Sequence, residues 1–436
     1  MPAAADGSCP EVIDDHEAGM LFSRHLTGNT EIVLAVSGGS DSMALMQLAA
    51  RWNASLEPSA RLNIHVVTVD HGLRPDAAAE AEFVVREAAL LDLPVQKLVW
   101  DGPHPKTGVP AAARQARYRL MANVCRQRKA VLVTAHTLDD QAETLVMALA
   151  RGAGVDGLSA MQSQTELNGL TVIRPLLEMS RARLRATLRE AGAKWVEDPS
   201  NHDTAYERVR VREALKLLER EGVNQAGLAR SSRRLSRARA ALAAAARTLE
   251  LKTVVHEVSG FGRIVKERFF LAPDEIQLRC LLTVTRTYGG GMAQSMAGAE
   301  GLLDWMQAGT EKARTFAGCR VVRRSGEFVV GREGERISET PVRIDPGQCV
   351  ANWDGRYRVS AGRKANPVEL MVLRDVDASL LPARPATVPD FVWQGLPVVV
   401  SAGNEVIMPF DEHQSGSPRQ QKVVFHLIAG QKTAQS

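Results

Sequence analysis

A tight turn near the N-terminus has the residue types that bind phosphate. An apolar run at 32–36 reads as a buried strand, and an amphipathic segment typical of a helix begins at about residue 41. Backbone amides at such a strand–turn–helix junction can hold an anion, and serine hydroxyls add further donors. The candidate nucleotide-binding residues are Ser37, Gly38, Gly39, Ser40, Asp41 and Ser42.

This turn lacks the lysine of the common phosphate loop and carries a carboxylate instead. Asp41 cannot approach a phosphate without repulsion, so a phosphate site here needs a cation between them. Oxygen ligands of this kind suit Mg²⁺. The alternative is a helix whose first turn is capped by Ser and Asp side chains.

A second group of acids, formed by Asp139, Asp140 and Glu143, opens the segment 138–151. Asp140 and Glu143 are three residues apart and share a helix face. Acids at this position can simply complement the helix dipole. His136 lies just upstream at the end of a predicted strand, which favours a functional site.

Basic and polar side chains on a predicted helix and after another strand are further candidates. Arg114 and Arg117 are three residues apart on one predicted helix and could clamp phosphates, or could be solvated. His71 and Arg74 follow the strand that ends near Asp70. Such a histidine could contact a base or ribose, although a lone histidine is usually structural.

The elements that position these residues alternate between strands and helices. The expected strands are 31–36, 62–69, 95–99 and 130–135, and the expected helices are 41–53, 76–92, 111–128 and 138–151. This order indicates a doubly wound parallel sheet. Ligands bind at the carboxyl ends of the strands in such sheets, so the polar residues after each strand should share one site.

Composition sets the broad class. The chain has 436 residues, of which 45% are hydrophobic and 24% charged, which fits a globular protein of two or three domains. We expect no secretory signal, no membrane span and a cytoplasmic location, because the apolar runs are short and the five cysteines are scattered.

The net charge of +4 is unevenly distributed. Residues 181–239 hold fifteen Lys/Arg and eight Asp/Glu, so the rest of the chain is about −3. Such a basic segment is typical of a polyanion-binding protein, although a solvated helix face is the alternative.

Six motifs, read in order, resemble the PP-loop ATP pyrophosphatases, and within them the tRNA(Ile)-lysidine synthase family. They are VSGGSDSMAL, VDHGLRPDAAAEAEFV, AARQARYRLM, AHTLDDQAETLVMALARGAGVDGLSAM, RPLLEMSRARLRATL and WVEDPSNHDTAYERVRVREAL. They cover about residues 31 to 215. The resemblance implies a ligase that cuts ATP between the α- and β-phosphates and adenylates the first anticodon cytidine of a tRNA(Ile) with a CAU anticodon. Free L-lysine then displaces AMP at C2 to give lysidine.

The resemblance also implies roles for single residues. Residues 37–42 would hold the phosphates of ATP, and Asp41 and Asp140 would hold Mg²⁺. Asp140 and Glu143 could bind the lysine ammonium, Arg117 could contact phosphates or the cytidine, and His136 would lie beside the reacting centre. The tRNA contacts would come from Arg208, Arg210 and Arg212, which alternate and so cannot all share one helix face.

The expected domains follow from this resemblance. Residues 1–30 would form an N-terminal extension that could be disordered, and 31–222 a Rossmann-like PP-loop catalytic domain. A long connector helix at 225–253 belongs to 223–335, which also holds a first small α+β tRNA-binding domain. A second, β-rich domain covers 345–436. The sequence leaves a monomer and a homodimer open.

Two other functions share some of these features. A PP-loop tRNA thiolase would need a reactive cysteine near the site, and Cys125 is the cysteine that the catalytic half offers after the turn. A non-catalytic RNA-binding protein would not need Asp41, Asp140 and Glu143 together.

Overall fold

A computed structural model describes residues 10–72, 77–102, 107–167, 169–197, 203–363, 365–409 and 423–427. The chain divides into two compact units, Met1–Arg239 and Ala240–Ser436. Residues 1–9 of the predicted extension and Arg74 lie outside the described residues.

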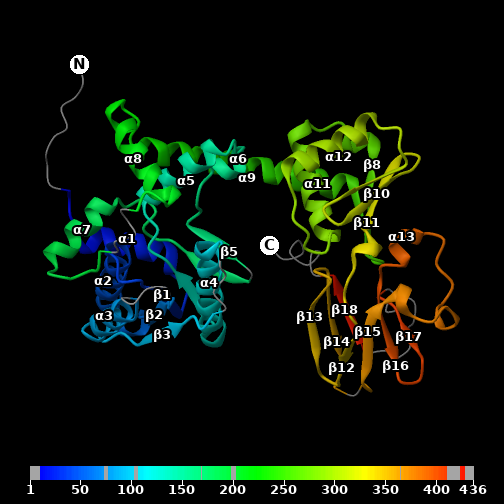
Figure 1. The fold of residues 1–436 in the computed structure, drawn as a ribbon, viewed down its shortest axis with the longest axis horizontal. Coiled ribbons are helices and arrows are strands. Elements are labelled where there is room, and N and C mark those ends of the chain that lie inside the picture. The colour runs from blue at the N-terminus through cyan, green and yellow to red at the C-terminus, as the bar shows by residue number, and fades with distance from the viewer. Residues whose placement is uncertain are drawn as a thin grey trace. The chain divides into compact units, whose positions relative to one another are not determined.

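A six-stranded sheet forms the centre of the first unit, in the order β3-β2-β1-β4-β6-β5 (Figure 1). Its strands are β1 (Glu31–Ala35), β2 (Asn63–Asp70), β3 (Val95–Val99), β4 (Val131–Val133), β5 (Gln164–Leu167) and β6 (Leu170–Ile173). β1 pairs in parallel with β2 and β4, and its central residues Ile32, Val33 and Leu34 are fully buried. The four predicted strands are confirmed. The hairpin of β5 and β6, whose edge strand is antiparallel, was not predicted.

Helices cover both faces of this sheet, which confirms the doubly wound class. The helices of the first unit are α1 (Asp15–Leu26), α2 (Ser40–Ser55), α3 (Ala77–Ala89), α4 (Val109–Arg128), α5 (Leu138–Ala150), α6 (Val155–Leu158), α7 (Arg181–Glu190) and α8 (Glu207–Arg220). Side chains of α1, α2, α3 and α7 form one core with the sheet, and α4 forms the core on the opposite face. The parallel strands β1, β2 and β4 are therefore buried on both sides, which explains their apolar runs, whereas the edge strand β3 is mostly exposed.

The prediction of a disordered N-terminal extension is wrong for the described residues 10–30. Helix α1 buries Phe22 and Leu26 in the core shared with α2 and α7. Arg183 of α7 binds both carboxylate oxygens of Glu17, at 2.7 and 2.6 Å. The backbone N–H of Ile13 donates to Thr187 Oγ1 at 3.0 Å. The apolar periodicity of α1 matches this burial, so the segment belongs to the first unit.

The connector helix is confirmed as α9 (Gln225–Thr253), but the boundary between the units lies inside it rather than near residue 222. Its first part stays with the first unit because Arg233 pairs with Glu178 at 2.6 Å and Ser236 donates to Gln162 at 2.8 Å. Side-chain contacts therefore keep the first part of α9 with the first unit, which moves the boundary beyond the expected one at 222/223.

The second unit contains two layers. The first has a five-stranded sheet in the order β7-β8-β11-β10-β9, and the second has a four-stranded and a three-stranded sheet. Its strands are β7 (Val254–Glu257), β8 (Phe261–Val265), β9 (Ala313–Phe316), β10 (Cys319–Arg323), β11 (Glu327–Arg332), β12 (Val342–Ile344), β13 (Cys349–Trp353), β14 (Tyr357–Ala361), β15 (Val368–Val372), β16 (Pro397–Ser401), β17 (Val406–Ile407) and β18 (Val423–Leu427). Its helices are α10 (Lys266–Phe269), α11 (Asp274–Tyr288), α12 (Met296–Ala308) and α13 (Asp390–Trp393).

A buried ion cluster joins these two layers, which the sequence divided into separate domains at 335 and 345. Arg332 of β11 binds Asp354 at 2.7 Å, and Arg356 binds the same carboxylate at 2.7 Å. All three side chains are at most 5% exposed. Because a buried charge must be paired, the cluster fixes how the two parts meet, and a shared apolar core, which includes Phe261 and Val398, joins them as one compact unit. Among the described residues, no helix is both long and apolar enough to cross a membrane.

We expect Phe22→Ala to destabilise the protein because it leaves a cavity next to Trp52, whose ring stacks on Phe22 with centroids 5.3 Å apart. The expected loss is roughly 3 kcal/mol of unfolding free energy, measured by urea denaturation of the full chain. Met20→Ala on the same helix is the control, because Met20 is 61% exposed and should change stability by less than about 0.5 kcal/mol. Equal stability of the two variants would show that α1 does not contribute to the core.

Candidate active site

The turn between β1 and α2 has the geometry expected of an anion cradle. Gly38 has a φ of +89°, which side-chain-bearing residues rarely adopt. Gly39 is the N-cap of α2 and has no side chain to cap it, so the first amides of the helix are left for a ligand. Ser42 Oγ accepts from the Ser37 N–H at 3.1 Å and donates to the Gly39 carbonyl at 2.9 Å. The serine hydroxyl therefore fixes the shape of the turn.

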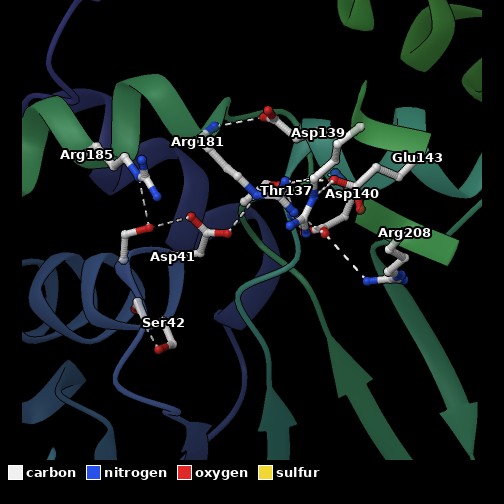
Figure 2. A network of polar contacts seen from close by, with 12 residues as sticks. Asp41, Ser42, Thr137, Asp139, Asp140, Glu143, Arg181, Arg185 and Arg208 are labelled. Atoms are coloured by element: carbon white, nitrogen blue, oxygen red, sulfur yellow. Dashed lines mark hydrogen bonds and ion pairs between the residues drawn. The ribbon is translucent and has the colours of Figure 1, made fainter. Parts of the chain in front are cut away.

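One guanidinium, that of Arg181 at the start of α7, binds all three predicted acids. Its Nε, Nη2 and Nη1 atoms lie 3.1 Å from Asp41, 2.5 Å from Asp140 and 2.7 Å from Glu143. Figure 2 shows Arg181 between Asp41 on one side and Asp140 and Glu143 on the other. Arg181 thus joins the turn at α2 to the acids of α5.

The fourth acid, Asp139, holds the base of the same arginine. Its carboxylate accepts from the backbone N–H of Arg181 at 2.8 Å, which satisfies a free amide at the N-terminus of α7. Asp140 also caps its own helix, because its Oδ2 accepts from the Thr137 N–H at 2.9 Å. Asp140 therefore serves its own helix, as the dipole interpretation expects, in addition to binding Arg181, whereas Asp139 binds the first amide of another helix, α7.

Burial and the guanidinium act in opposite directions on these acids. Burial raises the pKa of Asp41 above its ordinary value, although Arg181 counteracts it. Burial would also raise the pKa of Asp140, but Arg181 and the Thr137 N–H outweigh it and hold that pKa below the ordinary value. The pKa of Arg181 is raised by Asp140, Glu143 and Asp41 despite its own burial. Asp140 is therefore ionised and paired with the positively charged Arg181.

Helix α8 covers this cluster with two of the three predicted tRNA-binding arginines. Arg212 Nε donates to Glu143 Oε1 at 2.7 Å, and Arg208 Nη1 lies 3.8 Å from Asp140. Arg210 faces elsewhere and donates to the carbonyls of Thr204 and Ala205, each at 2.8 Å. The three arginines do not share a face, as expected from their spacing, and their contact with tRNA stays a prediction.

A cavity of about 1090 Å³ lies at the carboxyl ends of the strands. It brings together most of the predicted site, as the spacing along the sheet indicated. The predicted residues that line it are Ser37, Gly39, Ser40, Asp41, Ser42, His71, Arg117, His136 and Arg212. Asp140 and Glu143, at 6% and 1% exposure, do not line it and lie behind the arginines.

The remaining candidates Arg117, Arg114 and His136 differ in how far they are buried. Arg117 is buried enough that its pKa is lowered, whereas Arg114 is exposed and lies over the Tyr118 ring at 5.1 Å. Burial lowers the pKa of His136 to about 4, and its Nδ1 pairs with Thr134 Oγ1 at 2.9 Å. His136 is therefore neutral at pH 7 and suits hydrogen bonding better than charge pairing.

The sequence analysis missed the arginines of α7 that face the cavity. Arg181, Arg185 and Arg189 line it, and their spacing of four residues places them on one helix face. Two features of the sequence pointed to these arginines. Three acids close together need a cation, and a basic segment begins at residue 181. Only the fold brings the two features together.

The predicted Mg²⁺ ligands fit the ion only in part. Asp41 and Asp140 offer the right oxygen donors, but both already bind the Arg181 guanidinium. The described residues contain no group of three or more His, Cys, Asp or Glu side chains that could hold a metal ion. The magnesium site therefore stays a prediction.

Cys125 does not provide the reactive thiol that a thiolase would need. It is buried in the core under α4, and burial raises the pKa of its thiol to about 12. A thiol in this environment stays protonated and is a poor nucleophile.

Comparisons with known proteins place this site in context. The family model of the PP-loop domain matches residues 12–218. The tRNA(Ile)-lysidine synthase of Bradyrhizobium diazoefficiens is 47% identical over 284 residues, which are 64% of this chain and 78% of that protein. That of Rhodopseudomonas palustris is 41% identical over 338 residues, covering 77% and 97%. That of Ruegeria pomeroyi is 38% identical over 357 residues, covering 80% and 81%.

The lowered pKa of His136 predicts a pH-dependent contribution to stability. Between its ordinary value of 6.5 and about 4, the unfolded chain binds a proton that the folded protein does not. The unfolding free energy should therefore fall as the pH drops through this window, by on the order of 3 kcal/mol from this group. Denaturant unfolding at pH 7 and pH 4.5 measures it, with His136→Gln as the reference that lacks the titration. Identical pH dependence in both proteins would contradict the assignment.

Proposed function

The chain belongs to the tRNA(Ile)-lysidine synthase family, and on that premise we propose that its cavity carries out a two-step ligation on the anticodon of a tRNA(Ile). As a member of this family the chain is an ATP-using ligase that forms lysidine on tRNA(Ile). The observation that carries the proposal for this site is the uncapped turn of residues 37–42, which shares one cavity with Asp41, Arg117 and His136.

The first step would activate the base. The O2 atom of the first anticodon cytidine attacks the α-phosphorus of ATP, the bond from that phosphorus to the β-phosphate oxygen breaks, and pyrophosphate leaves with the electron pair. The amides at the start of α2 are suited to hold this leaving group, because a helix N-terminus favours negative charge. Arg117, a cation in the cavity wall, can stabilise the charge that develops on the phosphate.

The second step would join free lysine to the base. The lysine amine attacks C2, the C2–O2 bond breaks, and AMP leaves with the oxygen. The amine must lose a proton, and a carboxylate is a suitable acceptor. Glu143 has one such oxygen: Oε1 accepts from Arg181 and Arg212, while Oε2 is buried and has no hydrogen-bond partner in the part of the chain that the structure describes.

This route requires a rearrangement at the acids, because Arg181 and Arg212 lie between them and the cavity. A lysine ammonium that reaches Glu143 would take over contacts that these guanidiniums now make. The same limit applies to Mg²⁺, which would enter with ATP and neutralise phosphate charge if Asp41 and Asp140 turned towards it. In the observed arrangement, the charge of the acids is therefore balanced by the arginines.

The tRNA would bind through phosphate contacts from the basic segment, and the second unit would read the body of the tRNA by shape. Arg210 is the exposed member of the predicted trio and is free of carboxylate contacts among the described residues. Its guanidinium is therefore better placed for an RNA phosphate than those of Arg208 and Arg212.

Asp41→Ala should reduce tRNA-dependent pyrophosphate release by at least about 100-fold while tRNA affinity stays within twofold. The reason is that Asp41 lies in the phosphate turn and anchors Arg181, whereas RNA affinity arises elsewhere. Pyrophosphate release and nucleoside mass analysis of the anticodon, with ATP, lysine and a CAU tRNA(Ile), measure the effect. Glu190→Ala, an exposed acid on α7, is the control. Wild-type release by Asp41→Ala, or no lysidine from the unmodified protein, would refute the proposal.

Glu143→Gln should impair the lysine step more than the ATP step, because the charge that would attract the ammonium is lost while the turn is unchanged. We expect adenylated tRNA to accumulate, or the apparent KM for lysine to rise by about tenfold. Quench-flow analysis of the two steps separates these effects, with Glu190→Gln as the control. Loss of ATP binding with unchanged lysine dependence would make Glu143 a structural anchor for Arg181 and Arg212.

A further inference from the structure

The turn of residues 37–42 has an arginine beside it to which the sequence analysis assigned no role. Arg185 Nε donates to Ser40 Oγ at 3.3 Å, and Ser40 is the first residue of α2. Figure 2 shows the Arg185 side chain reaching from α7 towards this end of α2, on the other side of Asp41 from Asp140. Its guanidinium therefore lies where phosphates held by the turn would be.

The contacts of Arg185 leave its charge more available than that of its neighbour. Arg181 is neutralised by three carboxylates. Arg185 instead donates to a neutral hydroxyl and pairs with one carboxylate, that of Glu197, at 3.2 Å with side chains 40% and 55% exposed. An ion pair this exposed contributes little to stability, so an incoming phosphate can replace it.

The turn itself has a charge deficit that such a group would fill. The amides of a helix N-terminus amount to about half a positive charge, and the lysine of the common phosphate loop is absent. Asp41 adds a negative charge at the same place. A polyphosphate bound here needs a cation from another element, and α7 packs against α2 with its basic face towards the cavity.

We propose that Arg185 forms, with the turn of residues 37–42, a subsite for the β- and γ-phosphates of ATP and for the pyrophosphate that leaves. This inference rests on the proposed function. When the bond between the α-phosphorus and the bridging oxygen breaks, the electron pair stays on the pyrophosphate. Arg185 binds that added charge, so the arginine takes the part that a loop lysine plays in other nucleotide sites.

The test is equilibrium binding of inorganic pyrophosphate and of AMP to the full chain by calorimetry, without tRNA. Arg185→Met should raise the Kd for pyrophosphate by about 10- to 100-fold, since one charge-assisted hydrogen-bonded contact is lost. The Kd for AMP, which lacks the terminal phosphates, should stay within twofold. Arg185→Lys should retain most of the affinity, because phosphate also accepts a point charge.

Arg126→Met is the matched control, an exposed arginine on α4 that is hydrogen-bonded to Asn123 and does not line the cavity. Thermal unfolding of each variant checks that the fold is intact. An unchanged pyrophosphate Kd in Arg185→Met, or an equal loss for AMP, would overturn the proposal. If the unmodified protein forms lysidine while Arg185→Met binds pyrophosphate normally, only this inference fails. An unmodified protein that forms no lysidine would refute the proposed function itself.

Discussion

The first unit depends on the balance between one guanidinium and three carboxylates. Asp41 comes from α2 and Asp140 and Glu143 from α5, and Arg181 of α7 binds all of them at 2.5 to 3.1 Å. Without this cation the three acids would repel one another, and the two buried ones, Asp140 and Glu143, would also have lost their hydration, which costs several kcal/mol per ion. Arg181 therefore determines how the turn of residues 37–42, helix α5 and helix α7 are placed around the cavity.

The same balance divides the basic residues of the site into two groups. Arg181 and Arg212 form ion pairs with the acids, so their charge stabilises the observed arrangement. Arg185 is held by weaker contacts at the edge of the turn. Under the proposed function, the site binds ATP and then lysine. Such a site needs both groups of arginines, because the first group keeps the acids ionised and the second binds phosphate.

Much of this arrangement follows from sequence patterns that are local. The strands at 31–36, 62–69, 95–99 and 130–135 and the helix at 225–253 were predicted almost to the residue, because apolar period and turn residues report directly on them. The convergence of Ser37, His71 and His136 followed from the rule that parallel strands end at one edge, whereas Arg117 was a candidate because of its spacing on a helix. The role of Arg181 could not be predicted in this way, because its partners are 38 to 140 residues away and lie on other helices. The docking of α1 escaped prediction for the same reason.

The order in which the chain is synthesised gives the α1–α7 contact a further meaning. Glu17 and Ile13 are translated early, but their partners Arg183 and Thr187 follow 166 and 174 residues later. On the ribosome Phe22 can pack on Trp52 of α2 soon after both have emerged, whereas the contacts with α7 must wait until nearly the whole first unit has been made. Closing a contact of this length is slow and costs chain entropy. A nascent chain that stops before α7 can therefore pack α1 on α2, but it lacks Arg181, which binds the three acids, and Arg183 and Thr187, which hold residues 13 and 17 in place.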